Sequence, residues 1–329
     1  MTTSTPVKLG YLRKLLESRP HKDVLRTYLH QNEDALLKNA ILVTLHRKWS
    51  ARPPYGLSEI GITTYDRQRV NCGFPCPPGA HAEDLLEHVW CLHLRIRSNA
   101  HLPLDDASPD AFHFGTSVFV TYDEALDLLH HIWHQPMNDD RPDKGYRPII
   151  YLSHGDNDAL GKVRNIDCDF VPGQKDTTIA TLNAQDIAVH TKITSKSDAA
   201  IEYLLPIFKI IPFHAGNAGN AAIYTTVIAF LSALRNEVYQ SDDNPKARPG
   251  QKGPSSAKSA MTVVQGLMAR PTPPPPFGVL IYCCKCSSYL HFAAVCPNTD
   301  FVCTKCLGSK TDWRVQNAQT HMEGLCVFK

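Results

Sequence analysis

Cysteine spacing constrains this chain more than any other feature of its sequence. Seven of its 11 cysteines lie between Cys283 and Cys326, and they include two Cys-x2-Cys pairs. The pairs are Cys283 with Cys286 and Cys303 with Cys306. Each such turn directs two thiolates at one point, so two turns can close a tetrahedron around Zn²⁺. We therefore predict a zinc-ribbon-like module over residues 277–329, with these four cysteines holding a structural Zn²⁺.

Other ligand choices stay open within this module. Cys284 competes with Cys283 as the first ligand, and His291 and Cys296 are spare ligands. A unit this short cannot bury a useful apolar core, so a bound metal would supply its folding free energy. The competing interpretation is a small β unit whose cysteines are free and buried.

Basic and aromatic side chains are interleaved in the same tail. Residues 241–329 hold ten Lys or Arg against five Asp or Glu, whereas the rest of the chain is slightly acidic. The cations Lys285, Lys305 and Arg314 stand among the aromatics Tyr282, Tyr289, Phe292 and Trp313. Such a mixture suits single-stranded nucleic acid, but the aromatics could equally form the core of the module. Both interpretations remain open.

Apolar patterning predicts an α/β fold for the first 239 residues. Period-2 and short buried runs predict strands, and apolar residues at helical spacing predict helices between them. The expected strands are 41–45, 57–65, 116–121, 148–152 and 178–182, and the expected helices lie within 7–37 and at 81–94, 123–133, 199–205 and 221–234. We expect a mixed sheet with helices packed on it.

Composition changes sharply after this region. Residues 240–276 are rich in Pro, Gly and Ser and end in PTPPPP, so we predict a disordered linker with a short helix over 261–268. The predicted domains are N-terminal helices (1–37), an α/β domain (38–239), the linker (240–276) and the metal module (277–329).

Two classes of protein are disfavoured by the sequence. The chain contains no run of ~18 apolar residues, so we expect no membrane span. The N-terminal residues lack the apolar segment of a secretory signal. We therefore expect an intracellular protein of the nucleus or cytoplasm, not a secreted one.

Several motifs, taken in order, resemble the DEDDh exonuclease superfamily and more narrowly a fungal group of ribonuclease-H-like proteins. ILVTLHRKW and LSEIGITTYD resemble the first two strands, and RPIIYLSHGDNDALGKV resembles the strand and helix that carry a catalytic Asp. FHAGNAGNAAIYTTVIAFLSAL resembles the last motif, His-Asn-Ala-Gly-Asn-Asp-Ala-x-Tyr-Thr. The similarity covers about residues 38–236. It implies a ribonuclease-H-like mixed sheet flanked by helices, followed here by the small zinc-binding unit.

The resemblance also implies that most of the catalytic groups are replaced. In this superfamily four carboxylates hold two Mg²⁺ ions, and a His acts as general base in phosphodiester hydrolysis. The first Asp and Glu fall on His46 and Lys48, the second Asp falls on Asp158 and is kept, and the last His and Asp fall on Gly216 and Ala221. Losing three of four carboxylates removes the oxygen ligands that Mg²⁺ needs, so Mg²⁺ is not expected.

Two side chains near these positions are candidate spares. Glu59 lies in the second strand, where the superfamily has a structural Glu, and His214 lies two residues before Gly216. A rebuilt active site would need such spares to take over the lost roles.

We therefore expect a catalytically inactive ribonuclease-H-like protein that binds RNA or DNA, with RNA favoured, and that carries a zinc-ribbon tail. The expected nucleic-acid-binding residues are Lys48, Lys285, Lys305 and Arg314. The alternative is a protein-interaction scaffold with a protein partner. A second alternative is a divergent metal-dependent 3′–5′ exonuclease with a rebuilt site.

Overall fold

The fold is known from a computed structural model that describes residues 5–29, 35–69, 79–104, 109–138, 144–155, 170–239 and 259–328. Its centre is a six-stranded mixed sheet in the order β4-β3-β2-β1-β5-β6. The strands are β1 (Ile41–Trp49), β2 (Leu57–Asp66), β3 (Val89–Ile96), β4 (Ser117–Val120), β5 (Ile149–Ser153) and β6 (Thr178–Asn183). β1, β2 and β3 form an antiparallel meander, whereas β4, β5 and β6 run parallel to the neighbours they join.

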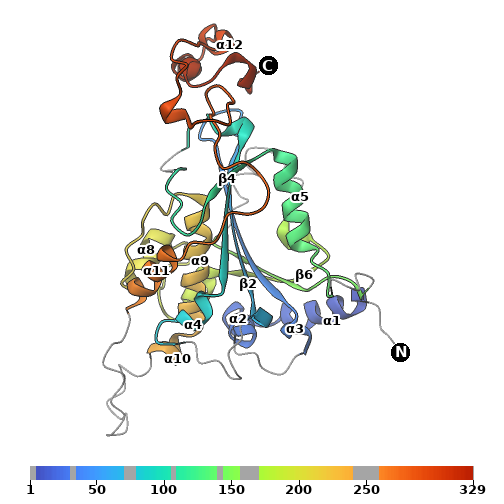
Figure 1. The fold of residues 1–329 in the computed structure, drawn as a ribbon. Coiled ribbons are helices and arrows are strands. Elements are labelled where there is room, and N and C mark those ends of the chain that lie inside the picture. The colour runs from blue at the N-terminus through green and yellow to red at the C-terminus, as the bar shows by residue number, and fades with distance from the viewer. Residues whose placement is uncertain are drawn as a thin grey trace.

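Helices cover both faces of this sheet (Figure 1). The helices of the described residues are α1 (Thr5–Glu17), α2 (His21–Leu29), α3 (Ala35–Lys38), α4 (Glu83–Leu86), α5 (Tyr122–Trp133), α7 (Ala184–His190), α8 (Ile201–Ile207), α9 (Ala218–Ala233), α10 (Arg235–Tyr239), α11 (Ala260–Ala269), α12 (Thr304–Leu307) and α13 (Asp312–Gln316), of which the last two lie in the C-terminal tail and not on the sheet. Single 3₁₀ turns lie at 67–69, 97–99, 172–174, 293–295, 317–319 and 323–325.

The two faces carry separate apolar cores. α9 is buried along its whole length and packs with α2, α7 and α8 on one face. α5 covers the other face, where Trp133 packs edge-on against Phe170. α9 is mainly apolar, and its Asn220, Thr225 and Thr226 find hydrogen-bond partners inside the protein, so the helix can be buried on every side.

A glycine sets how closely α9 approaches the sheet. A Cβ atom added to Gly61 of β2 would lie only 1.8 Å from the carbonyl oxygen of Ala218. Only a residue without a side chain permits this contact. Gly61 thus fixes the N-terminal end of α9 against the centre of the sheet.

The predicted fold class is confirmed, and most predicted elements are present within a few residues. The predicted helix at 81–94 is wrong: only α4 is helical there, and β3 occupies the second half. β3 is hydrogen-bonded to strands on both sides, and this pairing outweighs its local helical spacing.

Part of the predicted linker is folded. Residues 240–258 lie outside the described residues, but α11 packs Val263 and Val264 into the α9-side core. Beyond α11, the Thr272 amide donates to the Phe114 carbonyl, and the Thr272 hydroxyl accepts from the Cys91 amide. The prediction of disorder is therefore wrong for residues 259–276, because apolar positions within them reach the core.

Within the described ranges, no helix combines the length and apolar character needed to cross a membrane.

Candidate functional site

The two positions where the resemblance places the first Asp and Glu, His46 and Lys48, lie toward the end of β1. Alternate residues of a strand face the same side, so Thr44, His46 and Lys48 share the face that α9 covers. His46 is buried there, and its Nε2 lies 2.8 Å from the hydroxyl oxygen of Thr225 on α9. The position expected for the first carboxylate thus holds a hydrogen-bonded imidazole.

The His46 ring is neutral over the physiological range of pH. Its pKa is lowered to about 3, mainly by burial and to a smaller extent by the nearby His154 and Lys48. A neutral imidazole offers at most one ring nitrogen to a cation, and here Nε2 already contacts Thr225.

The positions where the resemblance places the last His and the last Asp, Gly216 and Ala221, lie at the start of α9. Asn217 caps this helix, since its side-chain oxygen accepts from the amides of Gly219 and Asn220. Gly216 precedes the cap, and Ala221 is buried in the first turn. Neither residue has a side-chain ligand or base to offer.

The described residues therefore do not fit a two-Mg²⁺ centre. Mg²⁺ is held by oxygen ligands, usually carboxylates, and positions 46, 48 and 221 supply none. Asp158, the fourth position, lies outside the described residues.

The Glu59 carboxylate is buried and caps the N-terminal end of α9. It is fully buried on β2; its Oε2 accepts from the Ala218 amide at 3.1 Å and lies 3.4 Å from Nε2 of His93. Burial alone would raise the pKa of Glu59, but His93, the Ala218 amide and Arg95 lower it overall. Its geometry is that of an ionised group that ties β2 and β3 to α9.

His214 faces away from this cap. Its side chain is exposed, its ring lies 5.4 Å from that of His113, and its backbone adopts a positive φ of 46°. Its carbonyl oxygen accepts from the Asn217 amide and the Asn220 side chain. The His214 backbone thus supports the α9 cap.

A buried hydroxyl cluster beside His46 was missed by sequence reasoning. Thr226 of α9 lies 2.9 Å from the Thr44 hydroxyl and 2.7 Å from the Thr63 hydroxyl. Threonines on the otherwise apolar faces of two strands and a helix are the signal that could have revealed it. This network joins β1, β2 and α9 through neutral groups.

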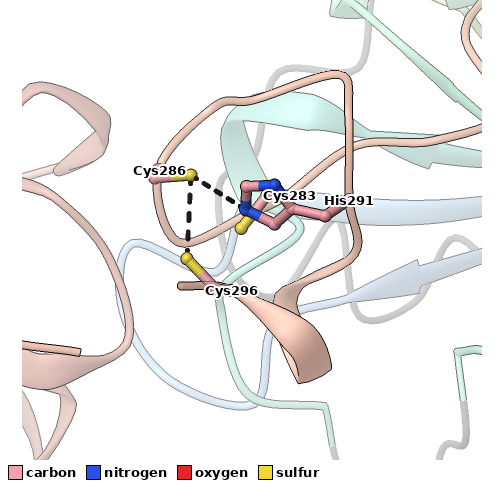
Figure 2. Close-up of side chains that lie close together, drawn as sticks. All are labelled: Cys283, Cys286, His291 and Cys296. Atoms are coloured by element: carbon pink, nitrogen blue, oxygen red, sulfur yellow. Dashed lines mark hydrogen bonds between the residues drawn. The ribbon is translucent and has the colours of Figure 1, made fainter. Parts of the chain in front are cut away.

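The tail contains a first metal-ligand cluster of Cys283, Cys286, His291 and Cys296, whose ligand atoms all lie within 4.8 Å of one another. Figure 2 shows the His291 ring and the Cys296 sulfur turned toward Cys286. The Cys286 Sγ lies 3.4 Å from His291 Nε2 and 3.7 Å from Cys296 Sγ. Three thiolates and one imidazole are a tetrahedral zinc donor set.

A second cluster follows in sequence. It comprises Cys303, Cys306, His321 and Cys326, again within 4.8 Å. The Cys306 Sγ lies 3.7 Å from both His321 Nε2 and Cys326 Sγ. His321 Nδ1 contacts the Thr320 hydroxyl, which leaves Nε2 to face the cysteines.

These clusters correct the predicted ligand set. The two Cys-x2-Cys pairs do not share one site: each is completed by a His-x4-Cys pair downstream. His291 and Cys296, expected as spares, belong to the first cluster, whereas Cys284 belongs to neither. The repeated His-x4-Cys spacing was the signal that could have revealed two sites.

In the second cluster, a cation would compete with a proton for Cys306. Burial and the neighbouring cysteines raise the pKa of the Cys306 thiol to about 12. Cys306 therefore keeps its proton at neutral pH without a metal, and a bound cation would displace that proton. The described C-terminal unit carries few other buried groups beyond its cysteines and Ala318.

The C-terminal unit is docked on the edge of the sheet. Val279 and Phe119 of β4 exchange two backbone hydrogen bonds, of 2.8 and 2.9 Å. The Tyr282 ring packs on the Phe119 ring, and Arg97 donates to the Tyr289 hydroxyl at 2.9 Å. Figure 1 shows this unit, in red, beyond one end of the sheet.

The expected nucleic-acid-binding cations are not gathered in one place. Lys48 lies on β1, and Lys285 lies in the first cluster's loop. Lys305 is exposed on α12, and Arg314 of α13 donates to the Lys305 carbonyl while its guanidinium lies over the Phe328 ring. Arg314 is thus engaged within its own unit.

Comparison with known proteins identifies the large domain. The DEDDh_C family model, described as DNA polymerase III subunit epsilon-like, C-terminal domain, matches residues 41–232. This match spans more than half of the 329 residues, and the chain belongs to that family. A search of curated proteins found none that matches the chain.

Proposed function

We propose that this DEDDh-family chain is a catalytically inactive, ribonuclease-H-like protein that binds nucleic acid, with RNA favoured, and carries a zinc-binding tail. The observation that carries this proposal is His46: a buried, neutral imidazole bonded to Thr225 stands where the first metal-binding carboxylate is expected. Lys48 and Ala221 at two further positions support the same conclusion.

Replacement of the carboxylates changes which charged ligands the site can attract. Four carboxylates repel a phosphate backbone unless cations neutralise them, whereas His46 is neutral and Lys48 adds a positive charge. The position of Lys48 near the start of α9 therefore supports metal-free binding of a phosphate backbone.

The tail supports a zinc-dependent fold. Two Cys₃His sets can each hold one Zn²⁺, and such ions supply folding free energy to units that lack an apolar core. Thiolate ligands require a reducing compartment, which suits the nucleus or cytoplasm.

Binding of labelled single-stranded RNA, measured by fluorescence anisotropy over a range of salt concentrations without Mg²⁺, tests the proposal. We expect the affinity to fall steeply as the salt concentration rises. Lys48→Glu should weaken binding and make the slope of log affinity against log salt concentration shallower, by an amount equivalent to roughly one or two phosphate contacts. Lys38→Glu, an exposed position on α3, is the matched control for the change of charge. A wild-type protein that binds no RNA or DNA would instead favour the protein scaffold.

A further inference from the structure

The first metal loop presents large apolar side chains to solvent. Tyr289 is 53% exposed, Leu290 88% and Phe292 47%, whereas Tyr282 beside them is only 4% exposed. The interpretation of these aromatics as the core of the module therefore holds for Tyr282 and not for Tyr289 or Phe292. Three large exposed apolar side chains within four residues are a candidate binding surface.

The loop that carries them is held from several sides. The Cys283 amide donates to the Ser288 carbonyl, and the Ser287 amide donates back to the Cys283 carbonyl, both at 2.8 Å. Tyr289 is further fixed by Arg97 and by its ring contact with Tyr282, at 5.8 Å between centroids. Rings that are ordered before binding lose little conformational entropy when a ligand arrives.

A continuous row of the sheet connects this loop to Lys48. Lys48 pairs with Glu59, Glu59 with Arg95, Arg95 with Phe119, and Phe119 with Val279. Four strand spacings of roughly 4.8 Å place Val279 about 20 Å from Lys48. From Phe119, the ring contacts with Tyr282 and then Tyr289 lead outward to the exposed surface.

The charges of the loop argue against a phosphate-binding role for it. Residues 277–301 contain one cation, Lys285, and one anion, Asp300. Apolar and aromatic faces without net charge interact with flat rings, and every nucleobase has such a face once it is unpaired.

We propose that Tyr289 and Phe292, with Leu290 between them, form a stacking platform for unpaired bases of a single strand whose backbone passes Lys48. This inference rests on the proposed function and names its substrate class: single-stranded rather than duplex nucleic acid. Lys48 supplies salt-dependent attraction, and the platform supplies salt-independent stacking.

Two single substitutions test the platform in the full zinc-loaded chain. We expect Tyr289→Ala and Phe292→Ala each to weaken binding of a ~12-nucleotide single-stranded RNA by about 5- to 100-fold and to leave the salt slope unchanged. Tyr289→Trp, which keeps a ring, retains most of the affinity. Trp90→Ala removes a half-exposed aromatic from β3 and is the matched control. Zinc content measured on each variant verifies that the loop is intact.

The outcomes separate the platform from the proposed function. Equal affinity for duplex and single strand, or unchanged binding by both alanine variants while Lys48→Glu weakens it, overturns the platform alone. A wild-type protein that binds no nucleic acid overturns both. A protein complex that the same variants disrupt, with RNA binding unaffected, assigns the surface to a protein partner and also overturns the platform.

Discussion

At the scale of single residues, the region where the family resemblance places metal ligands contains a cluster of neutral hydrogen-bonded side chains. His46 contacts Thr225, and the Thr44, Thr63 and Thr226 hydroxyls form a cluster beside it. Buried polar groups are costly unless they are paired, and these are paired with one another. The cluster therefore joins β1, β2 and α9 through contacts that need no cation.

The buried His46 ring makes stability sensitive to acid. Its pKa is lowered to about 3 in the folded chain, so between about pH 6.5 and 3 the unfolded chain takes up a proton that the folded chain refuses. Stability is therefore fully present above this window and falls with pH inside it, by about 1.4 kcal/mol per pH unit from this group. Urea unfolding of wild type and His46→Gln at several pH values measures the effect.

The free energy of unfolding of His46→Gln should fall less steeply with decreasing pH than that of the wild type. Burial also lowers the pKa of His154, so some acid sensitivity remains in the variant. Identical pH slopes in the two proteins would show that His46 titrates normally.

Glu59 gives a second prediction at this scale. Glu59→Ala leaves His93 and the Ala218 amide without their partner in a buried site, so we expect a loss of about 3–5 kcal/mol in the free energy of unfolding. Glu17→Ala, an exposed carboxylate on α1, should cost little. Chemical denaturation measures both, and a small loss for Glu59→Ala would reopen the hypothesis of a rebuilt active site.

At the scale of elements, the contact between β2 and α9 positions the whole site. We expect Gly61→Ala to destabilise the domain by more than about 3 kcal/mol or to prevent folding, because its Cβ would overlap backbone atoms of α9. Gly10→Ala is the control, since a Cβ at Gly10 of α1 meets nothing within 4 Å. Thermal unfolding of the two variants separates the outcomes, and a stable Gly61→Ala protein would contradict the close packing.

Helices and strands whose type is determined by their own local sequence were predictable. α9 is mainly apolar and β1 begins with a short continuous run of apolar residues, so the local sequence sufficed to predict both elements. β3 was missed because its strand form depends on pairing with β2 and β4, which are distant in sequence. α11 was placed correctly, but its docking on the core depends on tertiary contacts.

The candidate site residues also differ in how far the sequence alone could predict their arrangement. Motif order assigned metal-ligand positions to His46 and Lys48 on β1 and to Ala221 in the first turn of α9, and the structure brings His46 into contact with Thr225 of the same helix. The predicted grouping of all four cysteines into one site differs from the two clusters of the structure. Cys-x2-Cys spacing brings two thiolates together, but it does not determine which other residues complete the tetrahedron around the metal.

At the scale of the whole molecule, the tail docks on the edge of the sheet and contains two clusters of Cys and His that could each hold a metal ion. We expect two Zn²⁺ per chain by elemental analysis, since two separate Cys₃His clusters are present. Cys286→Ser and Cys306→Ser should each remove about one ion and leave the other. A single ion that either substitution abolishes would restore the four-cysteine site.

We propose that the DEDDh-family domain of this protein binds nucleic acid without cleaving it. The most direct test incubates end-labelled single-stranded RNA with the zinc-loaded protein and Mg²⁺ or Mn²⁺, and follows binding and strand length in the same samples. We expect a bound strand of unchanged length, because positions 46, 48 and 221 supply no carboxylate. Progressive shortening from the 3′ end that requires the metal and disappears in Asp158→Ala would contradict it.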